Sequence, residues 1–144
     1  MNQLLNSKGV SPMENKTVLV IEDNALNMKL VTTLLKVGKY DIIEAVDAEK
    51  GIQLARESKP DLILMDIQLP GMDGLNATRI IKEEPSLKNV KILALTSHAM
   101  DGDDKKAREA GCDGYITKPI DTKNFLKTID KFLNGKREIQ SAIQ

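Results

Sequence analysis

Three carboxylates follow two short apolar runs, and carboxylates placed in this way can hold a divalent cation. Val18–Ile21 leads directly into Glu22 and Asp23, and Leu62–Met65 leads into Asp66. Four consecutive apolar residues without alternation are typical of a strand that is buried on both faces of a parallel sheet. A charged carboxylate at the end of such a strand is costly unless another group pairs with it. The chemistry of Asp66 therefore depends on its partners.

A threonine and a lysine follow two later apolar segments. The run 90–95 leads into Thr96, and the segment 113–117 leads into Lys118. Mg²⁺ takes one or two carboxylates and completes its shell with water and phosphate oxygens. Phosphoryl transfer also needs a cation and a hydroxyl donor, and Lys118 and Thr96 can supply them. An aspartate can itself be the nucleophile, and Asp66 is best placed to form an aspartyl phosphate.

The elements that must position these residues alternate five times between strand and helix. We expect strands over 18–21, 41–45, 62–65, 90–95 and 113–117. We expect helices over 25–37, from a cap at Asp47 to Pro60, over 75–84, over 101–110, and from a cap at Asp121 to Gly135.

The first of these helices has Asn24 as its predicted cap, and Gly38 suits a left-handed residue just past its end. Short connections between parallel strands require right-handed crossovers, with helices on both faces of the sheet. The predicted fold is α/β, a doubly wound five-stranded parallel sheet with strand order 2-1-3-4-5. This order brings the strand-end residues to one edge of the sheet.

Length and composition exclude several classes of protein. The 144 residues suit one domain of the usual size, roughly 100 to 200 residues, and we expect it over 15–135, with a disordered tail over 1–14 and a short tail over 136–144. Lys plus Arg and Asp plus Glu each number 21, so no net charge favours nucleic acid or a membrane surface. The single Cys112, and the lack of a long apolar run or a signal sequence, predict a cytoplasmic protein without membrane insertion.

The strand-end motifs resemble the receiver domain of two-component response regulators. The resemblance covers 16–134 and rests on motifs in the family's order: Glu22 with Asp23, Asp66 in LMDIQLPGMDG, Thr96 with Ser97, and Lys118 with Pro119. The stretches VLVIEDNALNMKL, PDLILMDIQLP and YITKPI are similar to stand-alone receivers of the DivK type and to receivers of hybrid kinases. The fold that this resemblance implies is flavodoxin-like.

The resemblance also implies roles for the acidic residues and their neighbours. Asp66 is then the phosphoacceptor. Asp23, Asp66 and the backbone carbonyl of Gln68 ligate Mg²⁺, and Glu22 reaches the metal through water. Gln68 and His98 occupy positions at which family members adjust the hydrolysis of the phosphoaspartate.

A switch is implied by the same resemblance. Thr96 and Lys118 contact the phosphoryl group, and Thr96 moves toward it so that Tyr115 can turn inward. The helix over 101–110 has little to bury and is the natural mobile part. Together with Tyr115 and the last helix it forms the expected partner surface. The bond between Lys118 and Pro119 is a candidate for the cis form.

The function that we expect is that of a single-domain response regulator. Asp66 receives phosphate from a histidine kinase or a His-phosphotransfer protein, and the phosphoprotein binds a downstream protein. The chain assists its own phosphorylation and dephosphorylation but is not expected to turn over other substrates as an enzyme. We expect a monomer and leave dimerisation on phosphorylation open.

Three other functions are weighed against this one. A flavodoxin-like mononucleotide binder needs hydrogen-bond donors after the first strand, where this chain has the acidic EDNALN. A phosphatase with an aspartate nucleophile has a second aspartate two residues on, where this chain has Gln68. A docking module that never meets phosphate has no need of Asp23, Asp66, Thr96 and Lys118 together. Taken singly, Asp23 also suits a helix cap, Tyr115 suits plain packing, and Cys112 suits a small buried apolar residue.

Overall fold

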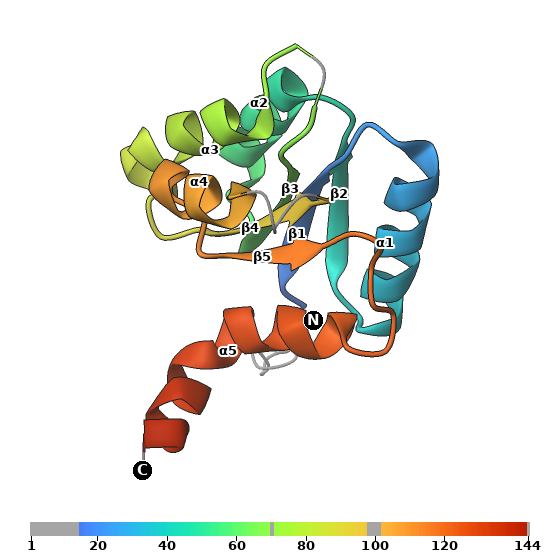
Figure 1. Ribbon diagram of the computed structural model, residues 1–144, viewed down its shortest axis with the longest axis vertical. Helices are drawn as coiled ribbons and strands as arrows, with labels where there is room; N and C mark the ends of the chain where they lie inside the picture. The colour runs from blue at the N-terminus through green and yellow to red at the C-terminus, as the bar shows by residue number, and fades with distance from the viewer. Residues whose placement is uncertain (1–14, 70, 98–101, 144) are drawn as a thin grey trace, which may run out of the picture.

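Helices pack on both faces of a central sheet in the computed structural model, which describes residues 15–69, 71–97 and 102–143 (Figure 1). The first half of the chain forms β1 (Thr17–Ile21), α1 (Ala25–Val37), β2 (Asp41–Ala45), α2 (Ala48–Ser58) and β3 (Leu62–Asp66). The second half forms α3 (Gly74–Glu83), the short 3₁₀ helix η2 (Pro85–Leu87), β4 (Lys91–Thr96), α4 (Asp103–Ala110), β5 (Gly114–Thr117) and α5 (Phe125–Ile143).

The sheet has the predicted topology. Its five strands are parallel and lie in the order β2-β1-β3-β4-β5, which confirms the doubly wound, flavodoxin-like fold. In this register Ile21 pairs with Met65, and Asp66 pairs with Leu95. The strand order reverses between β1 and β3, so the chain leaves these neighbouring strands in opposite directions. The resulting crevice at their carboxyl ends is the usual ligand site of such sheets.

Alternate strand residues build two aliphatic cores, one on each face of the sheet. On one face Leu19, Ile63 and Ile92 pack against α2, α3 and α4. On the other face Val20 and Leu64 pack against α1 and α5 (Figure 1). Because each central strand is buried on both faces, its sequence is a continuous apolar run and shows no alternation.

Aspartate or asparagine side chains cap three of the helices. Asn24, Asp47 and Asp73 each accept a hydrogen bond from the backbone N–H three residues further on, at 2.8 to 2.9 Å. The caps at Asn24 and Asp47 confirm the sequence prediction. The cap at Asp73 starts α3 at Gly74, one residue earlier than predicted.

The prediction of a left-handed Gly38 is wrong. Gly38 has a right-handed conformation with φ −79°, and Lys39 takes the left-handed conformation with φ 65°. The structure gives another reason for glycine at position 38. A Cβ atom there would lie 2.8 Å from Leu126 Cδ2 and 2.9 Å from Tyr40 Cε2, so a larger residue would require these side chains to shift.

The last helix differs from the prediction at both ends. α5 begins at Phe125 and runs to Ile143, so the predicted end at Gly135 is wrong. Asp121 caps the turn that precedes the helix, because its Oδ1 accepts a hydrogen bond from the Lys123 N–H at 3.1 Å.

Some predictions fall on parts of the chain that the structure does not cover. The predicted tail over 1–14, the start of a helix at Asp101, and His98 all lie outside the described residues. Within the part that is described, no helix has both the length and the apolar character needed to cross a membrane.

Candidate functional site

The strand order brings the strand-end polar residues together at the carboxyl edge of the sheet. Glu22 and Asp23 follow β1, Asp66 ends β3, Thr96 ends β4, and Lys118 follows β5. These four strands are direct neighbours. The edge therefore collects three carboxylates, a hydroxyl and an ammonium group, as the sequence predicted.

The three carboxylates form one cluster. Oxygen atoms of Glu22, Asp23 and Asp66 lie within 4.8 Å of one another. Glu22 and Asp66 are only 1% and 2% exposed, whereas Asp23 is open to solvent. A cluster of carboxylate oxygens with one solvent-facing member suits a hard cation that keeps some of its water, such as Mg²⁺.

One buried oxygen of this cluster supports the fit of a cation. Among the described residues, Glu22 Oε1 has no hydrogen-bond partner although it is fully buried. Its other oxygen, Oε2, accepts a hydrogen bond from the Asn24 N–H at 3.1 Å. A buried oxygen that accepts no hydrogen bond is costly, and a metal ion or its bound water can satisfy it.

Lys118 is the cation closest to this cluster in the described structure. Its Nζ lies 3.1 Å from Glu22 Oε1, in ion-pair range but without hydrogen-bond alignment, and 3.4 Å from Asp66 Oδ2. The Lys118 side chain is 15% exposed, so little solvent screens these interactions. One ammonium group cannot neutralise three carboxylates, so the cluster keeps an excess of negative charge.

Burial and the neighbouring negative charge both affect the pKa of Glu22. Burial raises the pKa of the Glu22 carboxyl above its ordinary value of 4.5, and the neighbouring Asp66 raises it further. The Asn24 N–H and Lys118 act in the opposite direction. The carboxylates are therefore crowded in a way that favours a bound cation.

The loop after β3 fixes the orientation of Asp66. The Gln68 N–H donates a hydrogen bond to Asp66 Oδ1 at 2.9 Å, which leaves Oδ2 facing Lys118. Gly74 allows the start of α3 to pack directly on the end of β3, because a Cβ atom there would lie 2.6 Å from the Ile67 Cα. The Gln68 side chain itself is exposed.

Thr96 and Tyr115 lie on neighbouring strands near the site. Thr96 is completely buried at the end of β4, while Tyr115 on β5 is 38% exposed. The tyrosine ring is thus not buried in this structure. The peptide bond between Lys118 and Pro119 is cis, as the sequence suggested.

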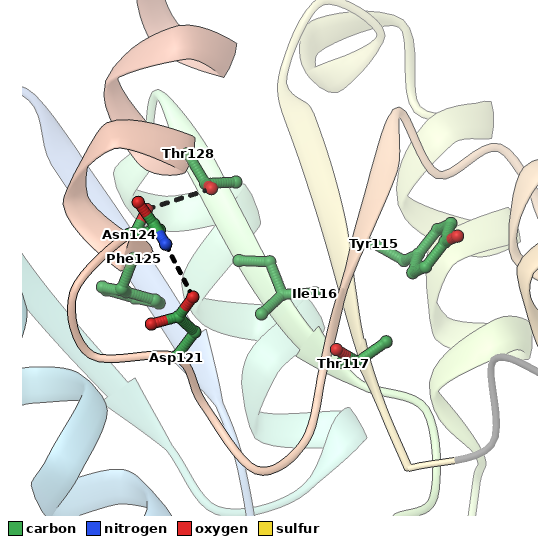
Figure 2. A pocket seen from close by; sticks show the side chains of 7 residues that line it. All are labelled: Tyr115, Ile116, Thr117, Asp121, Asn124, Phe125 and Thr128. Carbon is green, nitrogen blue, oxygen red and sulfur yellow. Dashed lines mark hydrogen bonds between the residues drawn. The ribbon is translucent and has the colours of Figure 1, made fainter.

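A shallow hollow lies beside Tyr115, between β5 and the start of α5 (Figure 2). Its volume is about 220 Å³, and it is lined by Tyr115, Ile116, Thr117, Asp121, Asn124, Phe125 and Thr128. Asn124 donates a hydrogen bond to Asp121 Oδ2 at 2.7 Å, and Thr128 donates one to the Asn124 carbonyl at 3.1 Å. The sequence did not predict these hydrogen bonds of Asn124 and Thr128, because single polar residues at a helix start carry no distinctive pattern.

Comparison with known proteins gives consistent matches. The family model described as the response regulator receiver domain matches residues 18–130. The polar-differentiation response regulator DivK of Brucella anthropi is 43% identical over 118 residues, which is 82% of this chain and 96% of the relative.

Two solved structures extend the comparison. The receiver domain of the sensor histidine kinase PA1611 from Pseudomonas aeruginosa, with a magnesium ion coordinated in its active-site cleft, is 29% identical with a TM-score of 0.79. The match covers 84% of this chain and 99% of that domain. The chemotaxis response regulator CheY4 of Vibrio cholerae shares the fold at 23% identity, with a TM-score of 0.78 over 82% of this chain and 98% of that one.

Proposed function

This chain belongs to the family of response regulator receiver domains, which act in two-component signalling, and from that premise we propose that Asp66 is its phosphoacceptor. In the proposed reaction, a carboxylate oxygen of Asp66 attacks the phosphorus of a phosphohistidine. The new O–P bond forms as the N–P bond breaks, and the histidine nitrogen keeps the electron pair of the broken bond. The donor is a histidine kinase or a His-phosphotransfer protein.

The observation that carries this proposal is the cluster of Glu22, Asp23 and Asp66 with Lys118 beside it. Asp23, Asp66 and the backbone carbonyl of Gln68 are the proposed ligands of Mg²⁺, and Glu22 holds one of the water molecules of the metal. When bound, Mg²⁺ offsets the repulsion between the carboxylates and the incoming phosphoryl oxygens.

Lys118 and Thr96 have complementary roles in the proposal. The Lys118 ammonium already lies 3.4 Å from Asp66 Oδ2, so it is close enough to stabilise charge on a phosphoryl group attached there. The Thr96 hydroxyl, at the end of the adjacent strand, donates a hydrogen bond to the same group. These residues also assist hydrolysis of the phosphoaspartate, with Gln68 and His98 adjusting its rate, and the protein does not act on other substrates as an enzyme.

Phosphorylation is proposed to change the surface formed by α4, β5 and α5. Thr96 moves toward the phosphoryl group, and Tyr115 turns inward from its exposed position. The hollow beside Tyr115 then changes shape, and a downstream protein binds there. The proposed receiver domain spans 15–135, acts as a cytoplasmic monomer, and needs neither nucleic acid nor membrane insertion.

Intact mass spectrometry with acetyl phosphate as the donor tests the phosphoacceptor. The wild type should gain one labile phosphoryl group with Mg²⁺ and none with a chelator, and Asp66→Asn should gain none. Asp61→Asn is the matched control, because it removes a carboxylate from the opposite end of β3 and keeps an acceptor for the Thr17 N–H. Labelling of Asp66→Asn to the level of the wild type would show that another residue is the acceptor and would refute the proposed role of Asp66. No labelling of the wild type, under conditions that label a known receiver, would favour a phosphate-independent docking module.

A further inference from the structure

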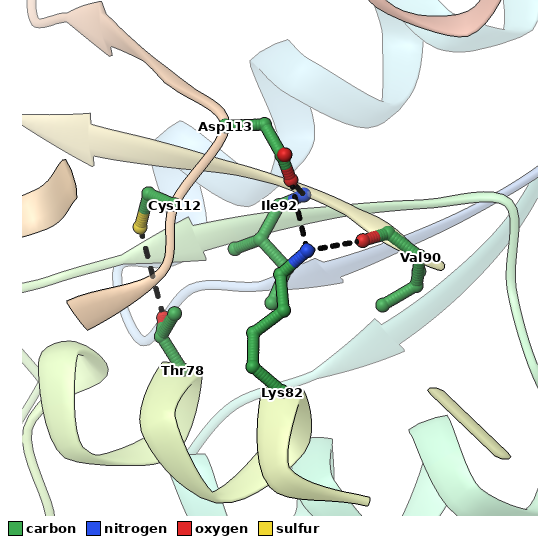
Figure 3. A network of polar contacts seen from close by, with 6 residues as sticks. All are labelled: Thr78, Lys82, Val90, Ile92, Cys112 and Asp113. Atoms are coloured by element: carbon green, nitrogen blue, oxygen red, sulfur yellow. Dashed lines mark hydrogen bonds and ion pairs between the residues drawn. The ribbon is translucent and has the colours of Figure 1, made fainter. Parts of the chain in front are cut away.

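A second polar cluster lies at the opposite edge of the sheet, at the amino ends of β4 and β5 (Figure 3). The Lys82 Nζ of α3 donates hydrogen bonds to the Val90 carbonyl at 2.7 Å and to Asp113 Oδ2 at 3.1 Å. The same Asp113 oxygen accepts a hydrogen bond from the Ile92 N–H at 2.8 Å. The Asp113 N–H donates to the Ile92 carbonyl at 2.7 Å. Asp113 is therefore bound to both β4 and α3.

The residues just before Asp113 fix the carboxyl end of α4. The Cys112 N–H donates to the Ala107 carbonyl at 2.9 Å, and the Cys112 thiol lies 3.8 Å from the buried Thr78 hydroxyl. Gly111 ends the helix in a left-handed conformation with φ 113°. It packs so closely on the Lys82 stem that a Cβ atom there would lie 3.0 Å from Lys82 Cγ. Side chains of α3 thus hold this end of α4 from two sides.

Fewer contacts are seen at the amino end of α4 among the residues that the structure describes, and a Cβ atom at Gly102 would meet no atom within 4 Å. Its N-cap is Gly102, with φ 89°, and no side-chain hydrogen bond caps the helix among the residues that the structure describes. From Lys105 to Ala110, only Ala107 and Ala110 are buried, and both lie in the second half of the helix. Within 105–110, the buried side chains of α4 therefore lie toward its carboxyl end.

We propose that Lys82 and Asp113 are positioning residues that make the carboxyl end of α4 a fixed pivot. A displacement of α4 then moves its amino end, roughly 12 Å away at 1.5 Å per residue, while the start of β5 keeps its register with β4. The pivot is a property of the unphosphorylated chain. Only the event that drives the displacement, phosphorylation of Asp66, rests on the proposed function.

Amide hydrogen exchange followed by NMR tests the pivot without phosphorylation. Lys82→Met keeps most of the apolar stem and removes both hydrogen bonds of the ammonium group. In Lys82→Met we expect the amides of Asp113 and Cys112 to exchange at least about tenfold faster than in the wild type. The change in exchange at the Leu64 amide of the central strand reports global unfolding and is subtracted from this effect. Lys82→Arg should restore slow exchange, because it returns a cationic donor.

Arg56→Met is the matched control for this experiment. It removes the ion pair between Arg56 and Glu84, at 2.6 Å, which joins α2 to the end of α3 but does not contact the α4–β5 connection. Exchange at Asp113 should not change in this variant. The pivot is refuted if Lys82→Met speeds exchange at Asp113 no more than at Leu64, or if Arg56→Met has the same effect.

A second measurement adds acetyl phosphate and Mg²⁺ to the NMR sample. In the wild type, phosphorylation should shift the amide resonances of Lys105 and Lys106 strongly and that of Asp113 weakly. In Lys82→Met the large shifts should extend to Asp113. Equal shifts at Lys105 and Asp113 in the phosphorylated wild type would refute the pivot. A lack of phosphorylation would refute the proposed function instead, and the exchange experiment would still decide the pivot.

Discussion

Asp23→Asn is expected to stabilise the metal-free protein, because Asp23 contributes mainly repulsion to the carboxylate cluster. In the described part of the chain, Asp23 makes no hydrogen bond or ion pair, and its carboxylate lies within 4.8 Å of those of Glu22 and Asp66. Asparagine has nearly the same shape as aspartate and removes the charge. The structure thus predicts a gain in stability at a position that the proposed reaction requires.

The magnitude follows from the separation of the charges. Two unit charges at 4.8 Å repel by about 1 to 2 kcal/mol at effective dielectric constants of about 80 to 40, the range that suits an exposed group beside a buried one. The unfolding free energy of Asp23→Asn in a chelator should exceed that of the wild type by this amount. Saturating Mg²⁺ should reverse the order, since a ligand at a hundred times its Kd stabilises the wild type by about 2.7 kcal/mol.

Urea unfolding followed by far-ultraviolet circular dichroism measures these free energies, because the chain has no tryptophan for fluorescence. Each protein is unfolded in a chelator and in saturating Mg²⁺. Asp47→Asn is the control, since asparagine is an equally good N-cap and position 47 lies outside the cluster. The reasoning is refuted if Asp23→Asn is less stable than the wild type in the chelator, or if Mg²⁺ stabilises both proteins equally.

Two further predictions concern packing and burial. Gly51→Ala should lower the unfolding free energy by about 1 to 3 kcal/mol, because the new Cβ atom would lie 2.7 Å from Ile21 Cγ1 and this clash outweighs the better helix propensity of alanine. If urea unfolding shows equal or greater stability for this variant, the observed packing of α2 on β1 is contradicted. Burial raises the pKa of the Cys112 thiol above its ordinary value of 9.0, so above this pH the thiol ionises more readily in the unfolded chain than in the folded one. The stability advantage of the wild type over Cys112→Ala should therefore shrink as the pH rises past 9.0. Urea titrations at pH 8 and pH 10 check this, and a constant difference between the two proteins would show that the thiol is not protected from ionisation.

The sequence was sufficient to predict the topology and the edge at which the candidate site lies. Continuous apolar runs such as 62–65 mark strands buried on both faces, and short connections between such strands allow few arrangements. Asp66 and Thr96 follow directly from this reasoning, because a residue that ends a buried parallel strand must lie at the carboxyl edge. The observed strand order and the match to the receiver family agree with that prediction.

Two predictions about single positions were wrong. Gly38 was expected to be left-handed from its place after α1, but Lys39 takes that conformation, and Gly38 packs against Leu126, which lies far along the chain. The end of α5 was placed at Gly135 because glycine often ends helices, yet the helix continues to Ile143. Local preferences amount to about 1 kcal/mol per residue, and other interactions readily outweigh them.

By itself, the sequence determined which residues can do chemistry and at which strand ends they stand, because hydrophobic runs and breaker residues act over a few neighbouring positions. The tertiary structure alone decided the distances, contacts and burial of these residues. It placed the Lys118 ammonium within ion-pair distance of both Glu22 and Asp66. It buried Glu22 so that one of its oxygens lacks a hydrogen-bond partner within the described chain. At the opposite edge it joined Lys82 to Asp113. Such contacts depend on the packing of segments that are far apart in sequence, and no local pattern specifies the distances between them.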